Sequence, residues 1–132
     1  MSIQSQVNSN VIGWALDPAQ RERLLKAFKP IYPDVIADHV TLDVGVAPDA
    51  ALPQETCGEI VGRVDDRTGL EVMVVSIGGS TLRPGGGLYH ITWSLDRARG
   101  RTAVQSNRVL AEWTWSRLAW PIPITLEPAR WP

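Results

Sequence analysis

Both histidines of the chain stand in the same local pattern, because each is followed two positions later by a threonine. The patterns are His39-x-Thr41 and His90-x-Thr92, and the residue between is apolar in both. Residues two apart in a strand point to one face, so each pattern places an imidazole beside a hydroxyl. With eight threonines in the chain, both pairings arise by chance in only about 1 % of random arrangements. The repetition therefore indicates one shared site.

Two imidazoles and two hydroxyls suit phosphodiester hydrolysis or transfer. An imidazole with an ordinary pKa near 6.5 can take up or release a proton close to neutral pH. One histidine would deprotonate the attacking oxygen and the other would protonate the leaving oxygen, each step contributing about 10²–10⁴ in rate. The hydroxyls of Thr41 and Thr92 would donate to the non-bridging phosphate oxygens, where charge accumulates. His39, His90, Thr41 and Thr92 are therefore the predicted catalytic residues.

Two other interpretations of the histidines remain open at this point. Each one taken alone can be an ordinary polar residue on the outer face of a half-buried strand. A zinc site needs further ligands, and Asp38 and Asp43 would complete only a poor ligand set. Cys57 is the one cysteine, which excludes a multi-cysteine zinc site and an internal disulfide framework. The sequence predicts no metal ion and no other cofactor.

The first pattern follows a predicted strand and helix. Residues 11–16 form a short apolar run, which is typical of a buried strand. Asp17 is a natural N-cap, with Pro18 at the first helical position and Gln20 at capping-box spacing, so a helix is expected to follow. Residues 39–46 alternate between apolar and polar side chains, which predicts a half-buried strand with His39, Thr41 and Asp43 on its polar face.

The second pattern lies in a similar setting. Strands are expected at 58–65, 70–77 and 88–95, with a turn at 66–69 and a glycine-rich loop at 78–87. Ser106 is expected to cap a helix over 107–118. Residues 121–128 are expected to form an edge strand, because Pro121 and Pro123 are disfavoured in a central one.

Four further residues are predicted to contact the substrate or to orient the imidazoles: Arg83, Tyr89, Ser94 and Asp43. Arg83 lies in the glycine-rich loop before the second pattern, and its planar guanidinium suits a phosphate. Asp43 and Ser94 extend the two polar stripes, and Tyr89 directly precedes His90. Trp115, Trp120 and Trp131 are candidates for stacking on a nucleobase or for filling a dimer contact.

Composition sets the broad class of the protein. The length of 132 residues predicts a single domain over 1–132. Thirteen basic residues against fourteen acidic ones give a net charge of -1, which disfavours non-specific binding to long nucleic acid. No apolar run approaches the roughly 20 residues of a spanning helix, and the first ten residues do not resemble a signal peptide. We therefore expect a cytoplasmic protein with no membrane partner.

Two His-x-Thr strands, one in each half of a small α+β chain, resemble the two-histidine phosphoesterase superfamily, which includes RNA 2′,3′-cyclic phosphodiesterases and RNA-end repair enzymes. The stretch GWALDPAQRERLLKAF through HVTLDVG resembles the first half, and YHITWSL with the following Ser106-Asn107 resembles the second. The resemblance covers about 11–127. It implies two pseudo-symmetric lobes of antiparallel sheet, about 10–65 and 70–128, with flanking helices around a central concave cleft.

The resemblance also implies an activity. The expected protein is a metal-independent phosphoric diester hydrolase that opens the 2′,3′-cyclic phosphate of an RNA end or a small nucleotide. One alternative is cleavage of 3′,5′-linked cyclic nucleotides or oligonucleotides, as in relatives connected with antiviral signalling. Another is a non-catalytic nucleotide- or RNA-binding protein of the same fold. Either histidine can be the acid or the base at this stage, and the oligomeric state is left open.

Overall fold

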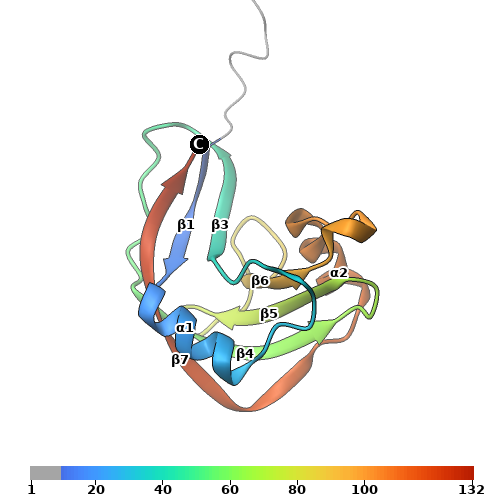
Figure 1. Ribbon diagram of the computed structural model, residues 1–132. Coiled ribbons are helices and arrows are strands. Elements are labelled where there is room, and N and C mark those ends of the chain that lie inside the picture. Colours follow the sequence, from blue (N-terminus) through green and yellow to red (C-terminus); the bar gives the residue numbers. More distant parts are fainter. Residues whose placement is uncertain (1–9) are drawn as a thin grey trace, which may run out of the picture.

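Seven antiparallel strands form one sheet that curls until its two ends approach each other (Figure 1). The computed structural model describes residues 10–132. The strand order is β2-β6-β5-β4-β7-β1-β3. The strand bounds are β1 Asn10–Leu16, β2 Asp34–Val35, β3 His39–Val46, β4 Cys57–Asp65, β5 Leu70–Ser76, β6 His90–Leu95 and β7 Ser116–Trp131. The helices are α1 Pro18–Ala27 and α2 Ser106–Glu112, with 3-10 turns at Arg97–Arg99 and Ala103–Gln105. The sheet-rich α+β class is confirmed.

The curl places the His-x-Thr strands next to each other. β3 is the last strand at one end of the sheet, and β6 is the second strand from the other end. In Figure 1, β1 and β3 rise beside the turned-up end of β7, whereas β4, β5 and β6 run across. β3 and β6 are in contact although no ladder joins them. Two segments about fifty residues apart in sequence thus meet across the concave side.

The long strand β7 joins the two parts of the sheet. It lies between β4 and β1, so the expectation of a final edge strand is wrong. β7 pairs with β4 over Ser116–Thr125 and with β1 over Leu126–Trp131, so each portion has its own partner. Pro123 is tolerated because its portion pairs only with β4 in the described ladders, and its carbonyl accepts a bond from Gln20 on α1. Pro123 thus avoids a position with partners on both sides, as proline is expected to do, but β7 as a whole is not an edge strand.

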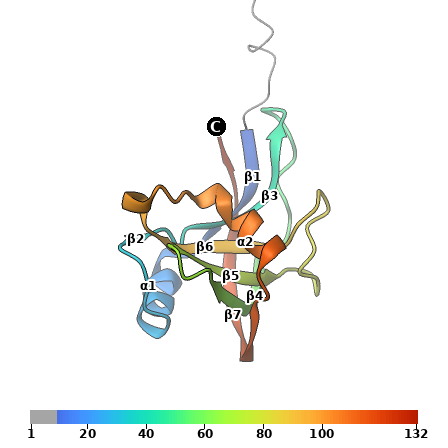
Figure 2. The ribbon, with the colours of Figure 1, turned by 90° about the vertical axis from the view of Figure 1, so that its right-hand side faces the viewer.

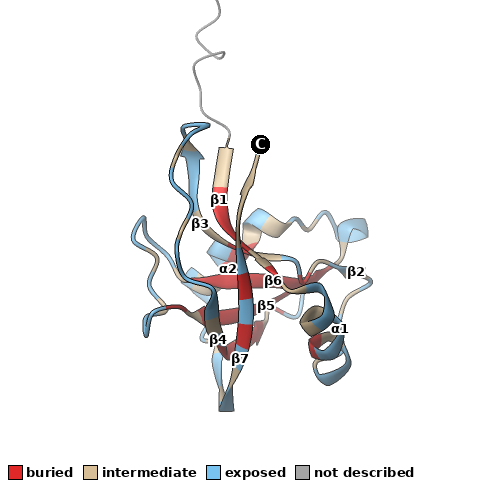
Figure 3. Cartoon of the chain, turned by 90° about the vertical axis from the view of Figure 1, so that its left-hand side faces the viewer, coloured by how far each residue is buried: buried red, intermediate tan, exposed pale blue. Residues whose placement is uncertain are grey.

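Helix α1 confirms the predicted helix. The Asp17 side chain accepts a hydrogen bond from the Gln20 amide at 3.0 Å, as an N-cap does. Leu24 is buried, and Leu25 and Phe28 pack against the same core. That core lies between α1 and the central strands of the sheet, which are largely buried (Figure 3).

Helix α2 is shorter than predicted. It ends at Glu112, and Trp113 is already extended with φ -109 and ψ 145. The cap also differs, because a 3-10 turn that begins after Thr102 leads into α2, and Ser106 makes no cap bond. Tryptophan and threonine prefer strands, which explains why the segment after Glu112 passes into β7. Figure 2 shows α2 in front of β5 and β6, where Val109 covers a second, smaller core cluster.

A β-bulge follows the threonine in both His-x-Thr strands. β1 advances by one residue while β3 advances from Thr41 to Asp43. β5 likewise advances by one residue while β6 advances from Thr92 to Ser94. An extra residue reverses the face of every later side chain. Asp43 and Ser94 are therefore turned away from the face of the threonines, and the predicted polar stripes stop at Thr41 and Thr92.

Among residues 10–132, no helix is both long and apolar enough to cross a membrane.

Candidate active site

A groove of about 320 Å³ lies where the two His-x-Thr strands approach each other. It takes side chains from β1, β3, β6, the loop before β6, the 3-10 turn Ala103–Gln105 and the start of α2. Its lining residues are Val11, His39, Thr41, Val44, Arg83, His90, Thr92, Ala103, Val104 and Asn107. The structure thus brings all four predicted catalytic residues into one groove, together with Arg83.

The close approach of β1 to β3 depends on Gly13. A Cβ at this position would collide with the carbonyl oxygen of Val40, and it would lie 3.0 Å from the Thr41 Cα. Both atoms belong to the backbone of the first His-x-Thr pattern, so the rotation of a side chain cannot relieve the clash. Gly13 therefore sets the position of β3 in the sheet.

His90 is a buried imidazole with a defined tautomer. It is 9 % exposed, and Nδ1 lies 2.9 Å from the carbonyl oxygen of Leu88. A carbonyl only accepts, so Nδ1 carries the proton and Nε2 carries the lone pair. Burial lowers the pKa of His90 from 6.5, and the nearby charges of Arg83 and His39 lower it further, against the opposing effect of the Leu88 bond. His90 is therefore neutral at pH 7 and suited to accept a proton.

His39 has a more open setting at the start of β3. Its side chain is 34 % exposed, and Nδ1 donates to Asp38 Oδ2 at 3.2 Å. Trp131, near the end of β7, packs against the imidazole with ring centroids 5.0 Å apart and planes at 51°. The carboxylate and the indole together fix the orientation of the ring. When His39 is protonated, Asp38 is its ion-pair partner.

The two threonines differ in how firmly they are held. Thr92 is 7 % exposed, and its hydroxyl lies 2.8 Å from that of Ser106, which is fully buried on α2. The same Thr92 oxygen lies 3.4 Å from the carbonyl oxygen of Ala103. Thr41 is half-buried on the edge strand and faces the same groove. Ser106 therefore positions one of the two predicted phosphate-binding hydroxyls.

Arg83 supplies the positive charge of the groove. Its loop is tied by backbone bonds between Arg83 and Gly87 and between Gly86 and Arg83, both at 3.0 Å. The side-chain Nε donates to the carbonyl of Gly86 at 3.0 Å, which leaves the terminal nitrogens of the guanidinium for a ligand. Among the described residues, the groove lining contains this one arginine and no carboxylate. Such a lining favours an anionic ligand.

The other three predicted substrate-binding residues lie outside the groove. Tyr89 is 7 % exposed in the core, where it packs edge-to-face on Trp14 with centroids 5.8 Å apart. The buried Ser94 hydroxyl donates to Glu71 at 2.7 Å on the far face of the sheet. Asp43 accepts a bond from the Val44 amide at 2.9 Å, and Val44 lines the groove in its place. For Asp43 and Ser94 the cause is the bulge after each threonine.

Sequence reasoning missed the roles of three residues that contact the predicted site. The sequence offers Asp38 only as a poor metal ligand, although its position directly before His39 is a usable signal for a partner of the imidazole. The sequence predicts Ser106 as a helix cap and, with Asn107, as part of the family resemblance, whereas its bond to Thr92 depends on tertiary packing. Asn107 lines the groove, and its Nδ2 donates to the Val104 carbonyl at 3.2 Å.

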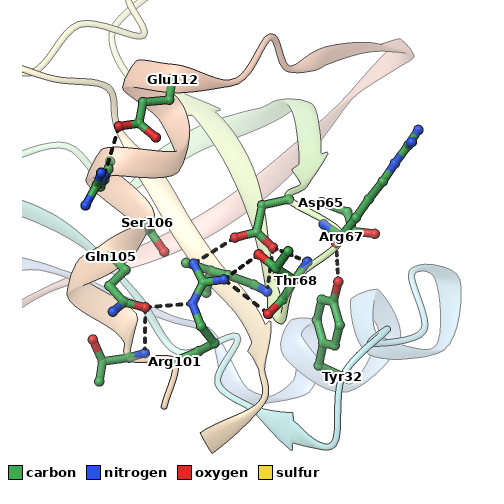
Figure 4. A network of polar contacts seen from close by, with 12 residues as sticks. Tyr32, Asp65, Arg67, Thr68, Arg101, Gln105, Ser106 and Glu112 are labelled. Carbon is green, nitrogen blue, oxygen red and sulfur yellow. Dashed lines mark hydrogen bonds and ion pairs between the residues drawn. The ribbon is translucent and has the colours of Figure 1, made fainter. Parts of the chain in front are cut away.

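A polar network behind the groove holds the segment that leads into α2 (Figure 4). Arg101 donates to Thr68 Oγ1 at 2.7 Å and to Gln105 at 2.8 Å, and it pairs with the buried Asp66 at 2.7 Å. Gln105 also accepts from the Thr102 amide at 3.2 Å, as in a capping box. The Arg101 guanidinium is bonded to Thr68, Gln105 and Asp66 of the same chain, so we assign the network a structural role.

The groove thus combines a neutral imidazole, a second imidazole beside a carboxylate, two hydroxyls and a guanidinium. This set can bind a phosphate group and move two protons at it. Within residues 10–132, no cluster of three or more histidine, cysteine, aspartate or glutamate side chains is placed to hold a metal ion. No family model, curated protein or solved structure matches the chain.

Proposed function

We propose that the protein is a metal-independent phosphodiesterase that opens the 2′,3′-cyclic phosphate of an RNA end or a nucleotide. The observation that carries the proposal is the meeting of both His-x-Thr pairs and Arg83 in one groove. The pairs come from opposite ends of the sheet, and only its curl brings them together. A purely structural role for the buried His90 and the partly exposed His39 does not require such convergence.

In this proposal the phosphate lies between the two threonines. The hydroxyls of Thr41 and Thr92 donate to the non-bridging oxygens, and Arg83 offsets their charge. Hydrogen-bond donors that are already in place stabilise the charge that develops in the transition state without further rearrangement. The bond from Ser106 holds the Thr92 hydroxyl in place.

The different surroundings of the two histidines favour distinct roles. His90, with its lowered pKa and an unprotonated Nε2, accepts the proton of the attacking water. His39, whose protonated form pairs with Asp38, donates a proton to the departing ribose oxygen. The new bond joins the water oxygen to phosphorus, and the bond from phosphorus to one ribose oxygen breaks. The product is a 2′- or 3′-monophosphate, carried by a nucleoside or by the RNA end according to the substrate.

We further propose that the chain is a member of the two-histidine phosphoesterase superfamily, with two pseudo-symmetric lobes around the groove. The repeated bulge supports this proposal, because β3 and β6 each reverse their faces directly after the motif threonine. Each strand also contributes its histidine and threonine to the same groove. A repeated local irregularity of this kind is expected from two related halves.

Product analysis tests the proposed activity. The purified protein is incubated in EDTA with 2′,3′-cyclic mononucleotides, with RNA ending in a 2′,3′-cyclic phosphate, and with 3′,5′-linked cyclic dinucleotides. Chromatography and mass spectrometry then identify the products. We expect opening of the 2′,3′-cyclic phosphates to a single monophosphate isomer, whose identity shows which ribose oxygen leaves.

The His39→Ala/His90→Ala double variant is the control, with its fold checked by circular dichroism. If only the 3′,5′-linked substrates are cleaved, the proposed 2′,3′-cyclic substrate is wrong and the protein is a phosphodiesterase for 3′,5′-linked cyclic nucleotides. If cyclic nucleotides bind tightly and are recovered unchanged, the protein is a nucleotide-binding protein and the proposal of an enzyme is wrong.

A further inference from the structure

A second groove, here called the leucine groove, adjoins the histidine groove on the side of the glycine-rich loop. It has a volume of about 330 Å³ and is lined by Leu82, Gly87, Leu88, Asn107, Leu110 and Ala111. The lining is apolar apart from one amide. Leu82 is 67 % exposed, so its side chain is accessible to a ligand in this groove.

Three observations show that residues of the two grooves adjoin. Asn107 lines both of them. The Leu88 carbonyl accepts the bond that fixes the tautomer of His90. The Arg83 guanidinium lies 3.5 Å from the place where a Cβ of Gly87 would stand. The leucine groove is therefore next to the place where a ligand would contact His90 and Arg83.

The contrast in lining matches the two ends of a nucleotide. Imidazoles, hydroxyls and an arginine suit the phosphate, whereas leucine side chains suit a flat base with apolar faces. The base and the 2′,3′-cyclic phosphate are attached to one ribose ring, so their binding sites must adjoin. The Nδ2 of Asn107 bonds Val104, which leaves its Oδ1 as an acceptor for the polar edge of a base.

We infer that the leucine groove binds the nucleobase of the substrate, with Leu82 and Ala111 on its walls and Asn107 at the base edge. This inference rests on the proposed function and narrows it. The substrate is then a nucleotide whose base is recognised, and a simple cyclic phosphodiester of a sugar is a poor substrate.

The test compares substrates with and without a base. Adenosine and uridine 2′,3′-cyclic phosphates are set against methyl riboside 2,3-cyclic phosphate, which has the same reacting group. We expect kcat/KM to favour the nucleotides by at least about tenfold, which corresponds to ~1.4 kcal/mol. Leu82→Ser and Ala111→Phe should reduce that preference several-fold and leave the rate with the methyl riboside unchanged. Leu82 and Ala111 are exposed, so neither change threatens the fold.

The matched control is Leu52→Ser, because Leu52 is 40 % exposed in the loop between β3 and β4 and lines neither groove. It should keep the full preference. Equal rates with and without a base in the wild type would overturn the leucine groove as a base site while the proposed activity stands.

A binding measurement separates this inference from the activity. Adenosine 3′-monophosphate and ribose 5-phosphate are titrated into the ¹⁵N-labelled protein, and amide shifts are followed by NMR. We expect the nucleotide alone to shift Leu88, Leu110 and Ala111. This result would support the base site even if no cyclic phosphate were hydrolysed. Base-dependent shifts confined to the Trp131 indole would overturn the inference and place the base on β7.

Discussion

Replacement of Arg101 tests whether the network of Figure 4 holds the wall of the groove. Arg101 is 18 % exposed and its partner Asp66 is 3 % exposed, so the pair is shielded from water. Arg101→Met keeps most of the aliphatic stem and removes the charge together with the bonds to Thr68 and Gln105.

The expected loss follows from what Asp66 retains. Removing one partner of a buried ion pair costs about 3–5 kcal/mol, because the other charge is left buried. Asp66 still accepts bonds from the amides of Thr68 and Leu70 at 2.9 and 3.0 Å, which offsets part of that cost. We expect Arg101→Met to lower the free energy of unfolding by about 2–3 kcal/mol. For a domain of this size the melting temperature then falls by roughly 10 °C.

The assay is urea denaturation at pH 7, with Arg99→Met as the matched control. Arg99 lies in the same segment and pairs with Asp96, but it is 59 % exposed, so its loss costs at most about 1 kcal/mol. If Arg101→Met is no less stable than Arg99→Met, the network does not hold this segment and the reasoning is wrong.

The pH dependence gives a second check on the same variant. Burial raises the pKa of Asp66, but the bonds from Thr68, Arg101 and Leu70 outweigh it and hold the pKa below 3.8. A carboxylate with a lowered pKa stabilises the fold above its unfolded pKa, and this contribution is lost as the pH falls through the folded value. The stability difference between the wild type and Arg101→Met should therefore shrink below pH 3.8.

Three further predictions follow from the groove. Ser106→Ala should lower the free energy of unfolding by about 1–2 kcal/mol, because the Thr92 hydroxyl loses the closer of its two hydrogen-bond partners. The same change should lower kcat/KM about tenfold, and unchanged kinetics would show that Ser106 does not position Thr92. Gly13→Ala should cost about 1–3 kcal/mol in urea denaturation, since its Cβ meets the backbone of Val40, and a neutral result would contradict the close approach of β1 to β3. Burial lowers the pKa of His90 from 6.5, so the acid limb of the kcat/KM profile should lie below pH 6.5, and a limb above that pH would exclude His90 as the base.

The sequence predicted which histidine and threonine side chains share a groove better than it predicted the topology. His-x-Thr spacing and strand alternation suffice to place His39 with Thr41 and His90 with Thr92 on one face, because this inference uses only two steps of a strand. The same alternation failed at Asp43 and Ser94, since a bulge has no clear signature in the residues themselves.

The errors in the last third of the chain have a different origin. The apolar spacing after Ser106 fits a helix, but Trp113 leaves the helix, and Leu118 reaches the core from β7 instead. Pro123 was expected only at an edge, and a strand that changes partner midway supplies two edges within one element. Both outcomes depend on contacts with β1 and β4 that local sequence does not encode.

The most direct test of the central claim is the hydrolysis of uridine 2′,3′-cyclic phosphate in EDTA by the wild type, His39→Ala, His90→Ala and the double variant. If the two imidazoles act at one phosphate, each single change should lower kcat by at least about 10²-fold. The kcat of the double variant should then be only slightly lower than that of the less active single variant, because the effects of groups that act as a unit are not additive. A folded single variant with wild-type turnover would contradict a site built from both histidines.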